Sequence, residues 1–273
     1  MEKRLILRGL LAGAVGGVLA FVFARILAEP LIQQAIDYED GRSHALGGDH
    51  EHEVFSRAIQ ENVGIGAALI LFGVAMGALY AVAYAICVGR VGRVKARPLA
   101  LLLAAAAFTG FFLVPFLKYP TNPPAVGNDE TIGLRSSLYL ILTGASVVLM
   151  ILATWLGRRL QPRFGTWNAA LLAVGAYVLA IAVLFALLPN LGDLAANKEL
   201  HQSTETPKPL TDADGKILFP GFPADLLYQF RLYAVGAQLL LWGAIGLVFG
   251  PLAERLLEAP RVAERPAVPV RAS

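Results

Sequence analysis

The chain has 273 residues, of which 56% are hydrophobic and only 16% are charged, and its mean hydropathy is +0.61. Soluble domains carry about 25% charged residues, so this composition argues against an ordinary soluble domain and indicates a protein embedded in lipid. The net charge of +3 comes from short basic clusters between apolar runs, without interleaved aromatic residues. That arrangement is typical of membrane topology signals and argues against nucleic-acid binding.

Six apolar runs of about 18 to 26 residues are long enough to cross a bilayer as helices. In chain order they are residues 5–27, 63–88, 99–117, 136–156, 169–188 and 232–249. They are continuously apolar rather than alternating, which favours helices over a barrel. The first run is too long for a signal-peptide core, so we expect it to be retained. The predicted fold is an all-α integral membrane protein, a six-helix bundle over residues 1–251, with a charged Pro/Ala-rich tail over 252–273 that we expect to be disordered.

Basic residues predict the orientation of the spans, because short loops rich in Lys and Arg stay in the cytoplasm. The two termini and the connections after the second and fourth runs hold 14 of the 23 basic residues but only 4 of the 20 acidic ones. Six crossings with both termini in the cytoplasm fit this asymmetry at every connection. The three predicted outward loops are then residues 28–62, 118–135 and 189–231.

The stretch "HALGGDHEHEVFSR" places three of the four histidines in the first outward segment. Imidazole nitrogens mixed with carboxylate oxygens suit divalent transition metals, including cobalt, nickel, copper and zinc. We therefore expect transient contact with a divalent cation and no tightly bound cofactor; the alternative is a solvated polar loop without a specific role. The candidate metal ligands are His44, His50, His52, Asp49, Glu51 and Glu53.

No carboxylate or histidine lies within a predicted span, whereas proton-coupled transporters keep ionisable groups there. The chain also lacks the GxxxxGK[ST] motif of an ATPase. It is therefore expected to form a passive path or to need a partner subunit. The spans contain no nucleophile–base pair, so we do not expect an enzyme. Gly9, Gly13 and Gly17 share one helical face, which would allow close packing within the bundle or against a second copy of the chain.

The segment "FLKYPTNPPAVGNDETIGLRSSLYL" leaves the third run, crosses the outer face and enters the fourth. Its prolines fix an extended path, Gly127 permits a turn, and Asn128 and Asp129 are both candidates to cap a short helix that contains Glu130. Such a rigid loop could shape the mouth of the bundle, or serve only as a stiff connector.

This segment, together with the outward "HALGGDHEHE", resembles the CbtA family of predicted bacterial cobalt transporter subunits. The resemblance implies cobalt uptake linked to cobalamin supply, a location in the inner membrane, and a small one-span partner, CbtB. His44, His50 and His52 match the family's histidine-bearing first outer loop. The residues that match its loop motif are Lys118, Tyr119, Pro120, Asn122, Pro123, Pro124 and Gly127.

The sequence thus predicts a membrane subunit that admits a divalent metal gathered by the histidine loop. Affinities at mixed nitrogen and oxygen sites follow a generic order, so only the resemblance favours cobalt. The alternative is a non-transporting accessory subunit that stabilises a membrane complex.

Overall fold

A computed structural model describes residues 2–48, 56, 59–92, 94–199 and 204–257. The predicted tail over 252–273 lies mostly outside this part of the chain. The long helices are α1 (Glu2–Phe23), α2 (Glu29–Ala45), α4 (Ile65–Cys87), α5 (Ala96–Ala107), α7 (Ile132–Leu187) and α9 (Ala224–Leu257). Short elements join them: η1 (Ala24–Ala28), η2 (Gln60–Gly64), η3 (Phe108–Leu113), α6 (Val114–Lys118), η4 (Asp129–Thr131), η5 (Leu191–Asp193), α8 (Ala195–Glu199), and the antiparallel hairpin of β1 (Leu210–Thr211) and β2 (Ile217–Phe219).

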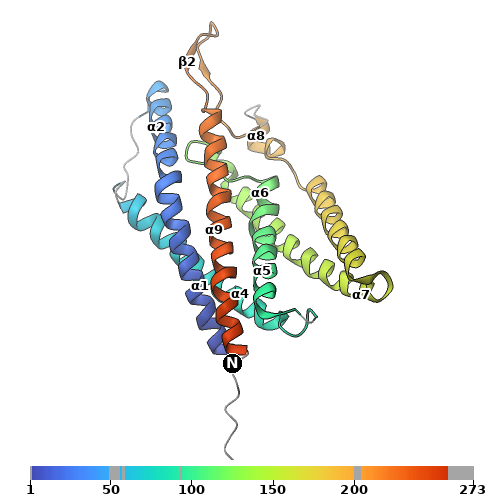
Figure 1. Cartoon of the computed structure of the whole chain (residues 1–273). Helices are drawn as coiled ribbons and strands as arrows, with labels where there is room; N and C mark the ends of the chain where they lie inside the picture. Colours follow the sequence, from blue (N-terminus) through green and yellow to red (C-terminus); the bar gives the residue numbers. More distant parts are fainter. Residues whose placement is uncertain (1, 49–55, 57–58, 93, 200–203, 258–273) are drawn as a thin grey trace, which may run out of the picture.

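Five helical segments of the described chain are long and apolar enough to cross a membrane: 2–45, 61–87, 96–118, 129–193 and 224–257. The fourth contains two helices that meet at Gly165, whose φ of 74° and ψ of 167° are not helical. The chain turns back there, so α7 is a pair of antiparallel arms (Figure 1). The predicted runs 136–156 and 169–188 lie in these two arms, and each other run lies in one long helical segment, apart from Val88 and Leu188, which directly follow α4 and α7. The all-α architecture of long apolar helices is therefore confirmed.

The first outward segment is not the loop that the sequence analysis predicted. The π-helical η1 joins α1 to α2, and the chain stays helical as far as Ala45. Pro30 stands in the first turn of α2, directly after the π-helical η1. The rest of α2 is held by tertiary contacts, because Tyr38 packs against Phe222 with a distance of 5.0 Å between ring centroids. The predicted outward loop over residues 28–62 was therefore wrong over 29–45, where the chain is helical.

Helices α1 and α4 pack backbone to backbone through their glycines. A Cβ added at Gly13 would lie 2.1 Å from the carbonyl oxygen of Gly73, and one added at Gly9 would lie 2.3 Å from that of Gly77. Such contacts leave no room for any side chain, as at close helix crossings in lipid. The glycine face is thus occupied within one chain. The expectation that Gly9, Gly13 and Gly17 could join two copies is corrected accordingly.

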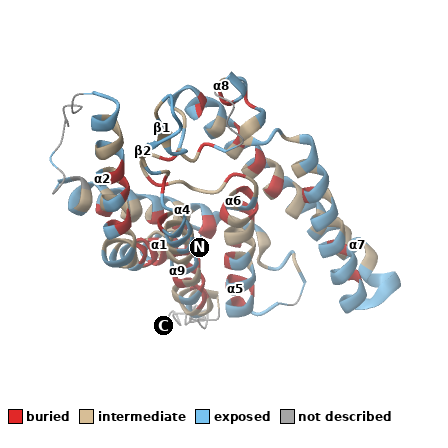
Figure 2. Ribbon diagram, turned by 90° about the horizontal axis from the view of Figure 1, so that it is seen from above, coloured by how far each residue is buried: buried red, intermediate tan, exposed pale blue. Residues whose placement is uncertain are grey.

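The bundle core lies where α1, α4, α5 and α9 meet. Phe249 of α9 is fully buried between Tyr80 and Tyr84 of α4, with ring centroids 5.2 and 4.9 Å away. The Tyr84 hydroxyl donates to the carbonyl of Ala96 at 3.0 Å, so its polar atom is satisfied inside the apolar core. Figure 2 shows buried residues concentrated among these helices, while much of α7 is exposed.

The two ends of the bundle differ in what they carry (Figure 1). The N-terminus, the end of α9 and the α4–α5 connection lie at one end, which we call the terminal end. The end of α2, the connection between α6 and η4, α8 and the β1–β2 hairpin lie at the opposite end, which we call the distal end. Described parts of all three segments predicted to face outward thus lie at the distal end.

Candidate functional site

The loop motif begins where α6 stops. Tyr119 leaves the helical region with φ of −127° and ψ of 76°, as expected for a residue before proline. The Lys118 ammonium donates to Asn190 Oδ1 at 2.7 Å, and the buried Tyr119 hydroxyl donates to the carbonyl of Pro189 at 2.7 Å. Burial raises the pKa of Tyr119, so its hydroxyl stays protonated and remains a donor. The first two motif residues therefore fasten the loop to the chain that follows α7.

The middle of the motif is held by α9. Arg231 donates through Nη2 to Asn122 Oδ1 at 2.7 Å and through Nε to the carbonyl of Thr121 at 3.3 Å. Pro123 is buried, and Val126 packs in a cluster with residues of α2 and α9. The motif is thus a fixed part of the distal end, with contacts to α2, α9 and the segment after α7.

The end of the motif turns through two residues with positive φ, Ala125 at 65° and Gly127 at 154°. A Cβ at Gly127 would lie 2.9 Å from Arg135 Nη1, so only glycine leaves space for the guanidinium. Asn128 then caps η4, accepting a hydrogen bond from the Glu130 N–H at 3.1 Å. Of the two predicted cap candidates, Asn128 is the cap, and Asp129 lies inside η4.

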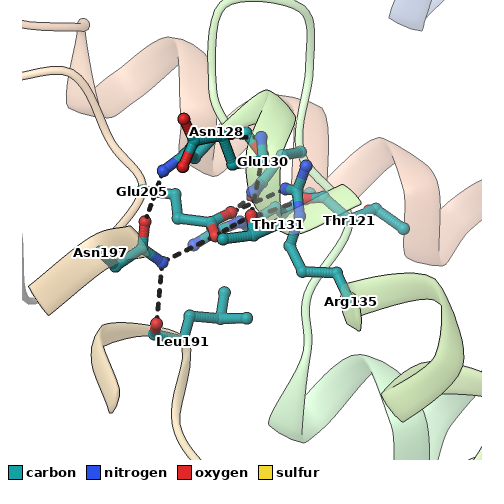
Figure 3. A network of polar contacts seen from close by, with 10 residues as sticks. Thr121, Asn128, Glu130, Thr131, Arg135, Leu191, Asn197 and Glu205 are labelled. Atoms are coloured by element: carbon teal, nitrogen blue, oxygen red, sulfur yellow. Dashed lines mark hydrogen bonds and ion pairs between the residues drawn. The ribbon is translucent and has the colours of Figure 1, made fainter. Parts of the chain in front are cut away.

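A buried polar network follows directly on the motif (Figure 3). The side chain of Glu205 is only 1% exposed and pairs with Arg135 at 2.7 Å between Oε2 and Nη1. Its other oxygen accepts from the Thr131 hydroxyl at 2.6 Å and from Asn197 Nδ2 at 2.8 Å. Asn197 also donates to the carbonyl of Leu191 at 2.8 Å and accepts from Asn128 Nδ2 at 3.0 Å. Four chain segments are thus joined around one carboxylate.

The network stabilises the packing of these chain segments and does not form an ion-binding site. Both oxygens of Glu205 are engaged, and the adjacent guanidinium neutralises its charge. Buried charges are stable only when paired and hydrogen-bonded in this way. The pairing of Arg135 with Glu205 was not predicted from the sequence. No local pattern could have revealed it, since the two residues are 70 positions apart.

The sequence model of the CbtA family, described as "Probable cobalt transporter subunit (CbtA)", matches residues 2–254. The chain belongs to the CbtA family. It is therefore a transporter-subunit family member with the long apolar helices of a multi-pass membrane protein. Comparisons with curated proteins and with solved structures found no match.

In this CbtA-family chain, His44 lies in the last turn of α2 rather than in an open loop. The helix ends just beyond it, and Gly47 turns the chain with φ of 78°. The other candidate ligands, Asp49, His50, Glu51, His52 and Glu53, lie outside the described residues. Within the part that the structure describes, no three His, Cys, Asp or Glu side chains are grouped so as to hold a metal ion.

A depression of about 490 Å³ lies beside α2 on the way from His44 to the membrane-spanning helices. Asp37 and Gln34 of α2 line it, facing Asp225 and Gln229 of α9. Asp37 and His44 are seven residues apart and therefore share one face of the helix. These oxygens give the distal end a local negative field that would attract a hydrated cation.

Proposed function

We propose that this chain is the membrane subunit of a divalent-metal uptake system of a bacterial inner membrane, with cobalt as its ion. The distal end faces outward and both termini face the cytoplasm. The histidine tract gathers the ion through His44, His50 and His52, together with Asp49, Glu51 and Glu53. The motif loop from Lys118 to Gly127 frames the entrance below it. The ion is a transient cargo and not a resident cofactor.

The observation that supports this proposal most is that the end of α2, which carries His44, and the motif loop lie at the same end of the bundle (Figure 1). The three segments predicted to face outward contain 16 of the 20 acidic residues of the chain but only 8 of its 23 basic residues. That surplus of carboxylates concentrates cations by simple attraction. It is also the charge asymmetry expected of the non-cytoplasmic side of a membrane protein.

The packing of the motif supports a division of labour at the entrance. Lys118, Tyr119 and Asn122 are all engaged with protein partners, and the nearby Glu205 is neutralised by Arg135. The motif therefore supplies a fixed frame, and capture of the ion is left to the histidines and the acidic groups around them. Cobalt is assigned from the family alone, because such ligands bind several metals.

Cellular accumulation of radioactive cobalt tests the proposal. Cells that express this chain, with and without a one-span CbtB-like subunit, are compared with cells carrying the triple variant His44→Ala, His50→Ala, His52→Ala. We expect the triple variant to reduce uptake most at low external cobalt, because weaker capture can be offset by a higher concentration. His201→Ala is the matched control, since this histidine lies in the third outward segment and outside the tract.

An accessory subunit without a transport role remains the alternative. In that case, cobalt uptake would be the same with and without the chain. If uptake depends on the chain but not on the three histidines, the transport role stands and the proposed capture role of the tract is wrong.

A further inference from the structure

A second cavity, of about 590 Å³, lies at the other end of the molecule, between α5, η3 and the two arms of α7. Its walls are mostly apolar and small, with Ala105 on α5, Ala153 and Gly157 on the first arm, and Ala170 on the second. Figure 1 shows α7 close to α6 near the distal end and spreading away from α5 toward the terminal end. The cavity therefore lies among helices that are long and apolar enough to cross a membrane, and in a bilayer its open side would face the hydrocarbon.

One end of this cavity is polar and basic. Arg158, Gln161 and Thr166 line it where the two arms of α7 meet, just beyond the predicted spans. The Arg158 guanidinium reaches across to donate to the carbonyl of Arg90 in the α4–α5 connection. Its position at the end of a span is the depth at which lipid phosphates lie.

The elements that form this mouth contain no acidic residue that could compensate its positive charge. The sequence has no acidic residue from 62 to 128 and none from 131 to 192, which are the stretches that form the cavity. The same stretches place Arg90, Lys95, Arg159 and Arg163 at the terminal end. The nearby carboxylate of Glu254 on α9 is already paired with Arg97 at 2.6 Å. The mouth is thus positively charged, while the rest of the cavity is apolar.

We propose that this cavity binds an anionic phospholipid of the surrounding bilayer, with an acyl chain between α5 and α7 and the phosphate at Arg158. The apolar walls pack against the acyl chain, and an arginine at the interface supplies charge-assisted hydrogen bonds to phosphate oxygens. A transmembrane helix would fill the apolar part but would bring no phosphate to the basic mouth. The charge therefore favours a lipid over a protein partner. The bound lipid would stabilise the spread arms of α7 against the rest of the bundle.

Native mass spectrometry of the full chain in detergent tests this site. Phosphatidylglycerol and phosphatidylcholine with identical acyl chains are added separately, and bound lipid is counted. We expect the wild type to retain phosphatidylglycerol more strongly. Arg158→Ala should reduce phosphatidylglycerol binding about fivefold, the effect of one arginine near a lipid surface, with little change for phosphatidylcholine. Arg158→Lys should keep most of the preference, and Arg255→Ala, at the same end on α9, should leave it unchanged.

A second pair of variants tests the apolar part of the site. Ala170→Leu fills the cavity from an exposed wall position and should weaken binding of both lipids. Ala186→Leu adds the same volume to an exposed position on the same arm outside the cavity and should have no effect. Equal binding of the two lipids by the wild type would overturn the proposal, as would unchanged phosphatidylglycerol binding in Arg158→Ala or in Ala170→Leu.

Discussion

Arg135 and Glu205 form a buried ion pair, 2.7 Å between Nη1 and Oε2, that ties the start of α7 to the segment before the β1–β2 hairpin. Glu205 is almost completely enclosed, and Thr131 and Asn197 satisfy its second oxygen. The pair adjoins the loop from Lys118 to Gly127, because the same guanidinium lies against Gly127. This pair is therefore one of the contacts that fix the shape of the distal end, together with those of Tyr119 and Arg231.

Removal of one member of the pair should destabilise the protein strongly. Arg135→Met leaves the Glu205 carboxylate buried without its cation, and the expected loss is about 3–5 kcal/mol in the free energy of unfolding. Thermal unfolding in detergent measures it. The double variant Arg135→Met, Glu205→Leu removes both charges and should recover part of the loss. A double variant no more stable than the single one would show that the charge pairing is not the cause.

Gly127 should resist substitution, because its φ of 154° and the 2.9 Å approach of Arg135 both exclude a side chain. Gly127→Ala is expected to cost about 1–3 kcal/mol through backbone strain, in addition to displacing the guanidinium. Gly133→Ala is the control, since it lies in α7 with no atom within 4 Å of an added Cβ. It should be neutral or stabilising by about 0.5–1 kcal/mol. Equal unfolding temperatures for the two variants would contradict this account of Gly127.

The glycine contact between α1 and α4 predicts that a large side chain destabilises the protein at Gly13 but is tolerated at a glycine without close neighbours. Gly13→Leu must push the two helices apart, because a Cβ there would lie 2.1 Å from the Gly73 carbonyl oxygen. We expect this variant to be degraded or to unfold at a much lower temperature. Gly144→Leu, on an exposed face of α7 with no neighbour near its Cβ position, should accumulate normally in the membrane. Normal folding of Gly13→Leu would refute the packing.

Local sequence patterns predicted much of this structure, and the errors have a common cause. The apolar runs and the Asn128 cap depend on neighbouring residues, so they could be found from the sequence. The contacts that build the distal end join distant segments, such as Arg231 to Asn122, and no local pattern encodes them. The helix over 29–45 was missed because Pro30 and the polar composition resemble a loop, while its stabilising contacts come from Phe222 and Leu226.

The hydroxyl of Tyr119 predicts a pH-dependent contribution. Tyr119→Phe removes its hydrogen bond to Pro189 and should cost about 1 kcal/mol. Burial raises the pKa of Tyr119 above its ordinary value of about 10, so the unfolded chain loses this proton first. The contribution should therefore be constant at neutral pH and fall as the pH rises above about 10. The difference in unfolding temperature between wild type and Tyr119→Phe, measured from pH 6 to 10.5, checks this.

Labelling of cysteines in intact cells tests the proposed orientation of the whole bundle. Cys87, the single native cysteine, is first replaced in a Cys87→Ser background. Ser43→Cys then places a thiol at the end of α2, and Arg159→Cys places one where the arms of α7 meet. A membrane-impermeant maleimide should label only the first, because the distal end faces outward in the proposal. Labelling of Arg159→Cys alone would place the histidines in the cytoplasm, where capture of external metal is impossible.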